Sequence, residues 1–342
     1  MKGGDILKRL LDVKNLSVDF LSNSGSIRAI DDVSFQVDQG ETVCIVGESG
    51  SGKSVTSLAL MRLLDYENGK ISGGEINFAG EDIVSKSQEE MRQLRGSDMS
   101  IIFQEPMTAL NPVFTIGRQL TEGIRTHQKV GKKEAWDRGI ELLNLVGLND
   151  VHSRMYQYPH ELSGGMRQRV MIAIALACKP KLLIADEPTT ALDVTIESQI
   201  LQLLNELKET INMSIIFITH DMGVAAEIAD SIIVMYAGKI VEQGTVYQIF
   251  DEPTHPYTKG LLESIPQESG PRQDRLYSIK GTIPNLTELP KGCRFSPRCK
   301  YATEKCFEKE PSLVLKNGRE VACWNYKEVL NEQTKPENKL IT

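Results

Sequence analysis

The stretch "TVCIVGESGSGKSVTSLALMRLL" (residues 42–64) places a glycine-rich turn between a short apolar run and a segment with helical spacing. Its centre, "GESGSGKS", matches the pattern G-x-x-x-x-G-K-S in the strand–turn–helix context that this pattern needs. The glycines let the backbone wrap closely, so that its N–H groups point at phosphate oxygens. The stretch therefore predicts a phosphate-binding loop, the P-loop, made by Gly47, Glu48, Ser49, Gly50, Ser51, Gly52, Lys53 and Ser54.

Side chains at the end of this loop and of a later strand suit magnesium and a nucleoside triphosphate. Lys53 would reach the β- and γ-phosphates, and Ser54 would offer its hydroxyl to Mg²⁺. The segment "LLIADE" (182–187) is an apolar strand that ends in two acids. In a P-loop enzyme Asp186 would hold Mg²⁺ through water, and Glu187 would polarise the attacking water.

Apolar strand patterns alternate with helical patterns through most of the 342-residue chain, which predicts an α/β fold with a mostly parallel sheet. Alternating segments before residue 40 predict an antiparallel strand set. A helical block near 110–160 interrupts this alternation of strands and helices and predicts a separate lobe. Seven prolines fall between Pro253 and Pro297, so we expect a loop-rich appendage there and not a continuation of the sheet.

Composition narrows the possible functions and the location. The net charge of −7 argues against a nucleic-acid binder that works through bulk positive charge. No run of 18 or more apolar residues could span a membrane, and the first residues lack an apolar signal core. We therefore expect a cytoplasmic protein with reduced thiols, in which clustered cysteines form a metal site or an inert set rather than a disulfide framework.

The segment "LSGGMRQR" (162–169) narrows the class of P-loop protein. Ser163, Gly164 and Gly165 would stand at a helix N-terminus, where free N–H groups and the helix dipole favour an anion. Together with the order of the other motifs, the segment makes residues 10–250 resemble the nucleotide-binding subunit of an ABC transporter. In that family two chains sandwich two ATP molecules, and this helix start closes over the γ-phosphate bound to the partner.

The resemblance also implies the architecture. We expect a P-loop NTPase of the ABC type with a RecA-like core, an antiparallel β subdomain and a helical subdomain. The nucleotide-binding domain would span residues 1–250, with its helical subdomain at about 105–165, and a C-terminal extension would span 251–342.

Four further positions match motifs of the family. Gln104, which ends the strand "SIIFQ", would contact Mg²⁺ and the attacking water, and Asp193 in "TTALD" would form part of the dimer face. His220 ends the strand "IIFITH" and would contact the γ-phosphate, although a histidine at a strand end is also compatible with a structural role. Phe20 would stack on adenine, or it could be a buried strand residue. The resemblance thus makes Glu187, His220 and Gln104 the catalytic residues.

Beyond residue 250 the resemblance narrows to a subgroup. The segments "DEPTHPYTKGLLESIP" (251–266) and "IKGTIPNLTELPKGCRFSPRC" (279–299) resemble the C-terminal extension of the oligopeptide, dipeptide and nickel uptake ABC importers. This implies an ATPase subunit that powers oligopeptide or dipeptide import from the cytoplasmic face of the cell membrane. Its partners would be a paralogous second ATPase subunit, two membrane permease subunits and an extracellular peptide-binding protein. Import of nickel or another small solute, a soluble non-transport ATPase and a homodimer remain alternatives.

The extension carries four of the six cysteines: Cys293, Cys299, Cys306 and Cys323. Their spacing lacks the paired C-x2-C hooks of short zinc knuckles and the common ferredoxin pattern. A proline-rich segment with few large apolar residues needs a staple, and the resemblance implies a [4Fe–4S] cluster in some members; zinc and no metal stay open. Five basic residues would favour deprotonation of the thiols: Lys291, Arg294, Arg298, Lys300 and Lys305. We expect an accessory tail whose loss of order leaves the nucleotide site intact.

Overall fold

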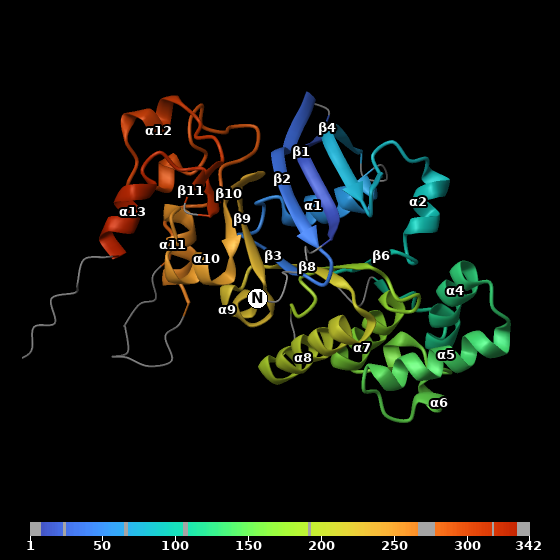
Figure 1. Cartoon of the computed structure of the whole chain (residues 1–342). Coiled ribbons are helices and arrows are strands. Elements are labelled where there is room, and N and C mark those ends of the chain that lie inside the picture. Colours follow the sequence, from blue (N-terminus) through green and yellow to red (C-terminus); the bar gives the residue numbers. More distant parts are fainter. Residues whose placement is uncertain are drawn as a thin grey trace, which may run out of the picture.

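The computed structural model describes residues 8–22, 25–64, 68–104, 109–190, 193–265, 278–316 and 318–333. Two sheets form its framework (Figure 1). The larger has eight strands in the order β11-β12-β10-β9-β3-β8-β7-β6, and the smaller has four in the order β2-β1-β4-β5. The predicted α/β fold with a parallel core and an antiparallel strand set is confirmed.

Five neighbouring strands of the larger sheet run parallel, from its edge inward: β6 (Met99–Ile102), β7 (Leu182–Asp186), β8 (Ser214–Thr219), β3 (Thr42–Val46) and β9 (Ser231–Tyr236). Every residue of β3, β7 and β8 is buried, as the continuous apolar runs of these strands predict. Because parallel strands end at the same edge of the sheet, the segments that follow them meet there.

The antiparallel sheet consists of β1 (Arg9–Ser22), β2 (Gly25–Asp38), β4 (Gly69–Phe78) and β5 (Glu81–Asp82). Its apolar face shares one hydrophobic core with α1 (Lys53–Leu60), the helix that follows the P-loop. This sheet therefore packs against the helix that follows the phosphate-binding loop.

Helices cover the sheets and form the predicted helical block. Figure 1 shows α4, α5 and α6 grouped on the side of the molecule opposite to the C-terminal elements. The domain limits given above stay a prediction. Besides α1, the α-helices that the structure describes before residue 252 are α2 (Gln88–Leu94), α4 (Ile116–Gln128), α5 (Lys132–Leu145), α6 (Val151–Arg154), α7 (Gly164–Ala175), α8 (Val194–Ile211), α9 (Met222–Ile228) and α10 (Val246–Asp251).

The C-terminal segment does continue the sheet, so the expectation of an appendage outside it is wrong. β11 (Val314–Lys316) and β12 (Arg319–Val321) form a hairpin, and β12 pairs antiparallel with β10 (Lys239–Thr245). β10 forms a hairpin with β9. Without β12, the other edge of β10 would have no strand paired with it. The dipeptide Asn-Gly at 317–318 is a strong hairpin signal, which the prolines outweighed.

Helices and aromatic packing fix the rest of this segment. It contains α11 (Pro256–Glu263), a 3₁₀ turn at Ser296–Arg298, α12 (Glu304–Glu308) and α13 (Tyr326–Gln333). The buried ring of Phe295 lies 5.2 Å from the ring of Tyr236 on β9 and 5.4 Å from that of Tyr257 on α11, centroid to centroid. The segment therefore has an aromatic anchor of its own, which its sparse apolar composition did not predict.

We predict that Phe295→Ala lowers the free energy of unfolding by about 3–5 kcal/mol, because it empties the centre of this cluster. Chemical denaturation of the purified chain measures the change. Phe307→Ala is the matched control, since the Phe307 side chain in the same segment is exposed. Equal losses for the two variants would contradict the anchoring role of Phe295.

Candidate nucleotide site

A pocket of about 600 Å³ lies where the segments after β3, β6, β7 and β8 meet. The volume falls in the range of small-molecule sites. Twelve residues of the described part of the chain line it: Glu48, Ser49, Gly50, Gly52, Lys53, Ser54, Val55, Gln104, Glu187, Thr190, His220 and Leu261. The pocket thus brings together nine of the residues predicted for the nucleotide site, although Glu48 and His220 are 172 positions apart. Leu261 joins them from the C-terminal part.

The P-loop backbone needs glycine for two reasons. Gly47 and Gly52 have φ angles of 153° and 107°, which side-chain-bearing residues rarely adopt. A Cβ on Gly47 would lie 2.3 Å from the carbonyl oxygen of Met235, and one on Gly52 would lie 2.7 Å from Cδ1 of Ile30. The loop is therefore packed directly against β9 and β2, with no room for any side chain at these positions.

Lys53 supplies a desolvated cation to this pocket. Its Nζ donates to the carbonyl oxygens of Gly47 (2.7 Å) and Glu48 (3.2 Å) and lies 3.7 Å from Oε1 of Glu187. Burial lowers the pKa of Lys53, while Glu187 and Asp186 act to raise it. An ammonium group that is partly stripped of water is well placed to attract phosphate oxygens.

Asp186 and Ser54 form an oxygen-rich corner that suits magnesium. The Ser54 hydroxyl donates to Oδ1 of Asp186 (3.2 Å) and that of Ser57 donates to Oδ2 (3.3 Å). Burial raises the pKa of Asp186, against the lowering effect of these hydrogen bonds. Mg²⁺ usually takes one or two protein oxygens together with phosphates and waters, so the Ser54–Asp186 pair fits it. Ser57, one helical turn after Ser54, was missed by the sequence analysis.

Three residues converge on one oxygen of the Glu187 carboxylate, the one that does not approach Lys53. Its Oε2 accepts from Nε2 of Gln104 (3.0 Å) and from the hydroxyl of Thr190 (3.1 Å), and lies 3.3 Å from Nδ1 of His220. Glu187 has a φ of 47°, an uncommon backbone state for a residue with a side chain. The structure thus places Gln104, Glu187 and His220 in contact, and it adds Thr190, which lies in the segment "TTALD" but was given no role there.

The remaining family positions lie outside this pocket. The Ser163 side chain caps α7 by accepting from the N–H of Met166 (3.3 Å), and Asp193 caps α8 by accepting from that of Ile196 (3.0 Å). Neither residue lines the pocket, nor does Gly164 or Gly165. Open space surrounds the position of a Cβ on Gly164. A role of these residues across a dimer stays a prediction.

Phe20 is also absent from the pocket lining. Its ring lies on β1 over Gly69 of β4, where a Cβ on Gly69 would be 2.9 Å away, and it packs on the core of the antiparallel sheet. Stacking of Phe20 on adenine therefore stays a prediction.

The four C-terminal cysteines are free thiols that line one small cavity of about 10 Å³. Burial raises the pKa of Cys299 to about 11 and that of Cys323 to about 12. In the described part of the chain, no group of three or more His, Cys, Asp or Glu side chains could hold a metal ion as it stands.

The charge of Lys300 acts to lower the pKa of Cys299 as expected, but burial outweighs it, so the expected net lowering of the thiol pKa values is wrong for Cys293, Cys299 and Cys323. Several of the other basic side chains are engaged elsewhere. Arg294 pairs with Asp31. Arg298 pairs with Glu48, and the Lys305 ammonium lies 3.5 Å from the ring centroid of Trp324.

None of the helices within the described ranges combines the length and the apolar character that crossing a membrane requires.

Two family models match the chain: "ABC transporter" at residues 30–190 and "Oligopeptide/dipeptide transporter, C-terminal region" at 241–306. The oligopeptide transport ATP-binding protein AppD of Bacillus subtilis is 53% identical over 96% of this chain and 100% of its own length. The dipeptide transport ATP-binding protein DppD of Haemophilus influenzae is 53% identical over 96% of this chain and 98% of its own length.

Solved structures agree with these sequence relatives. A dimeric ATP-binding cassette, MJ0796, in a post-hydrolysis state with ADP and Pi is 28% identical, with a TM-score of 0.63 over 69% of this chain and 99% of that one. The protein cbiO1 of Clostridium perfringens, part of the ABC transporter complex cbiONQ, is 29% identical, with a TM-score of 0.61 over 72% of this chain and 92% of that one. The chain therefore belongs to the ABC transporter family, in the group of the oligopeptide and dipeptide transport ATP-binding proteins.

Proposed function

We propose that this chain hydrolyses ATP and thereby powers the import of oligopeptides or dipeptides through a multi-subunit ABC transporter. The observation that carries the proposal is the pocket lined by Lys53, Ser54, Gln104, Glu187 and His220, with Asp186 hydrogen-bonded to Ser54 beside it. The match of residues 241–306 to the oligopeptide/dipeptide C-terminal region supports the substrate class.

Each group in the pocket has a task in phosphoryl transfer. The P-loop N–H groups and Lys53 hold the phosphates, which supplies positioning and charge compensation. Mg²⁺, held by Ser54 and Asp186, would neutralise charge on the phosphate oxygens. Glu187 accepts the proton of the attacking water, and its hydrogen bonds from Gln104 and Thr190 orient the carboxylate. His220, next to Glu187, is placed to contact the γ-phosphate.

The geometry also supports a requirement for a second ATPase chain. Ser163 and the glycines after it stand at the start of α7, outside the pocket of their own chain. A partner's α7 would complete the pocket from the open side, as the dimeric form of a related cassette suggests. We propose a paralogous ATPase subunit as this partner, with two permease subunits and an extracellular peptide-binding protein, at the cytoplasmic face of the membrane. Phe20 would contact the adenine and Asp193 the partner subunit.

A nickel or small-solute importer shares the same ATPase design, because solute choice lies in the binding protein and the membrane subunits. Uptake into vesicles that carry the assembled transporter separates the two: a labelled short peptide enters with ATP, and nickel does not. Nickel uptake without peptide uptake would overturn the peptide assignment.

We predict that Glu187→Gln keeps ATP binding but reduces hydrolysis about 10²- to 10⁴-fold, because the amide cannot accept the proton of water. ATP turnover by the assembled transporter measures the effect, and peptide uptake should be lost with it. Glu209→Gln, an exposed position at the end of α8, is the control and should retain both activities. Wild-type turnover by Glu187→Gln would refute the assignment.

We further propose that Cys293, Cys299, Cys306 and Cys323 hold a [4Fe–4S] cluster, with zinc as the alternative. The support is that four thiols between Cys293 and Cys323 line one cavity, and four thiolates are the donor set that such a cluster takes. A cavity of about 10 Å³ has room for little more than one water, so loading requires these segments to move apart.

We predict about four iron and four sulfide per chain in anaerobically purified protein, with an absorbance band that Cys306→Ser removes. Elemental analysis measures iron and zinc, and an assay for acid-labile sulfide measures the sulfide. One zinc without sulfide would favour the zinc alternative, and neither metal in fresh protein would overturn metal binding at this cavity.

A further inference from the structure

The C-terminal extension contacts the P-loop directly, through an ion pair between Arg298 and Glu48. Nη1 of Arg298 donates to Oε2 of Glu48 (2.8 Å) and Nη2 donates to Oε1 (3.1 Å), which is a two-pronged geometry. The Arg298 side chain is 6% exposed and that of Glu48 is 29% exposed. Bidentate, charge-assisted hydrogen bonds of this kind are among the stronger polar contacts in proteins.

A second residue of the extension holds the main chain of the same P-loop residue. The N–H of Glu48 donates to the hydroxyl of Tyr257 (2.8 Å) on α11, whose ring is fully buried between Tyr236 and Phe295. Leu261, one helical turn further on, lines the nucleotide pocket. Both the side chain and the backbone of Glu48 are therefore fixed from the C-terminal side.

The position of Glu48 matters for the phosphate site. Its carbonyl oxygen accepts from Nζ of Lys53 (3.2 Å) and from the N–H of Ser51 (3.2 Å). A displacement of Glu48 would therefore move the acceptor that orients the Lys53 ammonium and the turn that carries the phosphate-binding N–H groups.

Arg298 is itself held rigidly. It donates to the carbonyl oxygens of Lys280 (2.9 Å), Gly281 (3.1 Å) and Ile279 (3.3 Å), besides its contact with Glu48. α11 is fixed as well, since the buried carboxylate of Glu242 on β10 accepts from the N–H groups of Thr254 (2.7 Å) and His255 (2.9 Å) at the start of the helix. Arg298 and Tyr257, the two residues that hold Glu48, are thus fixed in place by the sheet and by the extension.

We propose that Arg298 is a positioning residue of the nucleotide site, which holds the P-loop through Glu48, so that the C-terminal extension sets the affinity for ATP. The inference rests on the proposed function only in that the pocket binds ATP. Lys cannot replace Arg298 fully, because a single ammonium does not match both carboxylate oxygens.

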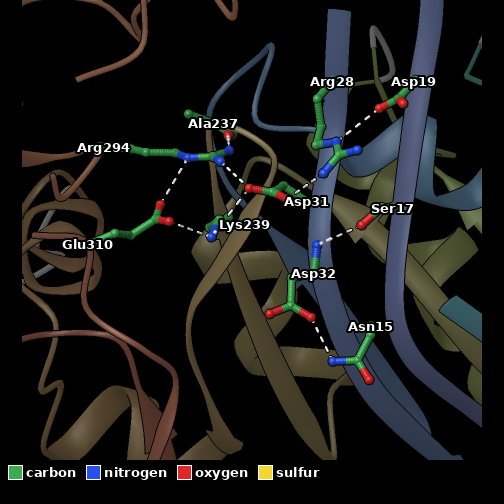
Figure 2. Close-up of polar contacts among 10 residues, drawn as sticks. All are labelled: Asn15, Ser17, Asp19, Arg28, Asp31, Asp32, Ala237, Lys239, Arg294 and Glu310. Atoms are coloured by element: carbon green, nitrogen blue, oxygen red, sulfur yellow. Dashed lines mark hydrogen bonds and ion pairs between the residues drawn. The ribbon is translucent and has the colours of Figure 1, made fainter. Parts of the chain in front are cut away.

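Arg294 offers a matched control within the same segment. Figure 2 shows it reaching Asp31 on β2, Ala237 in the β9–β10 turn and Glu310, with Lys239 between the two acids. Its side chain is 11% exposed, and its hydrogen bonds tie the extension to the sheets without touching the P-loop. Loss of Arg294 therefore tests general anchoring of the extension, whereas loss of Arg298 tests the contact with Glu48.

The test is titration of the purified full-length chain with a fluorescent ATP analogue and Mg²⁺. We expect Arg298→Gln to weaken binding about tenfold, Arg298→Lys to weaken it about threefold, and Arg294→Gln to stay within about twofold of the wild type. Glu48→Gln breaks the pair from the P-loop side and leaves the extension unaltered, so it provides the same test should the Arg298 variants fail to fold.

A double-mutant cycle isolates the pair. Once Arg298→Gln is present, Glu48→Gln should weaken binding by no more than about twofold further. Any of three results would overturn the proposal: additive losses in the double variant, wild-type affinity in Arg298→Gln, or an equal loss in Arg294→Gln. In each of these cases the wild type would still bind ATP. A wild-type chain that binds no ATP would instead overturn the proposed function, and this inference with it.

Discussion

The register of three parallel strands is the constraint on which the site depends. Val46 of β3 is aligned with Thr219 of β8, and Asp186 of β7 is aligned with Ile218 of β8. The P-loop, the two acids and His220 consequently leave the sheet at one edge and at one level. A slip of one residue would turn the buried faces of these strands toward the wrong layer. Because every residue of β3, β7 and β8 is buried, a slip would disrupt the packing on both faces of the sheet, so the hydrophobic core sets the catalytic geometry.

At this edge of the sheet the charged side chains of Lys53 and Asp186 are buried. Burial acts in opposite directions on Lys53, whose pKa is lowered, and Asp186, whose pKa is raised. Burial disfavours the charged form of both groups, and the phosphates and the magnesium of the substrate would offset that cost. The positive φ of Glu187 and its ring of hydrogen-bond donors fit the same principle, since both hold one carboxylate in a fixed direction.

Local motifs located most of the residues that line the pocket. The phosphate loop, the pair Asp186 and Glu187, and the Ser163 cap each depend on residues close in sequence, and each has a pattern with a physical reason. The contacts of Thr190 and Ser57 escaped because a single hydroxyl has no pattern of its own. The β11–β12 hairpin had a signal in "NG", which the high proline content of the region obscured.

The contact of Arg298 with Glu48 could not be read from the sequence, because the two residues are 250 positions apart. Sequence reasoning assigned Arg298 to the thiols that it neighbours, and it treated the extension as independent of the nucleotide site. The structure corrects both interpretations. An aromatic anchor around Phe295 and a helix held by Glu242 place the extension against the P-loop, so this segment is part of the wall of the site.

The most direct test of the account is calorimetric titration of the purified chain with MgATP, compared between the wild type and Lys53→Met. The account predicts one ATP per wild-type chain and an affinity at least about tenfold weaker in the variant, since the variant lacks the buried cation that faces the phosphates. Wild-type affinity in Lys53→Met would contradict it, because the pocket would then bind ATP without the group around which its phosphate site is built.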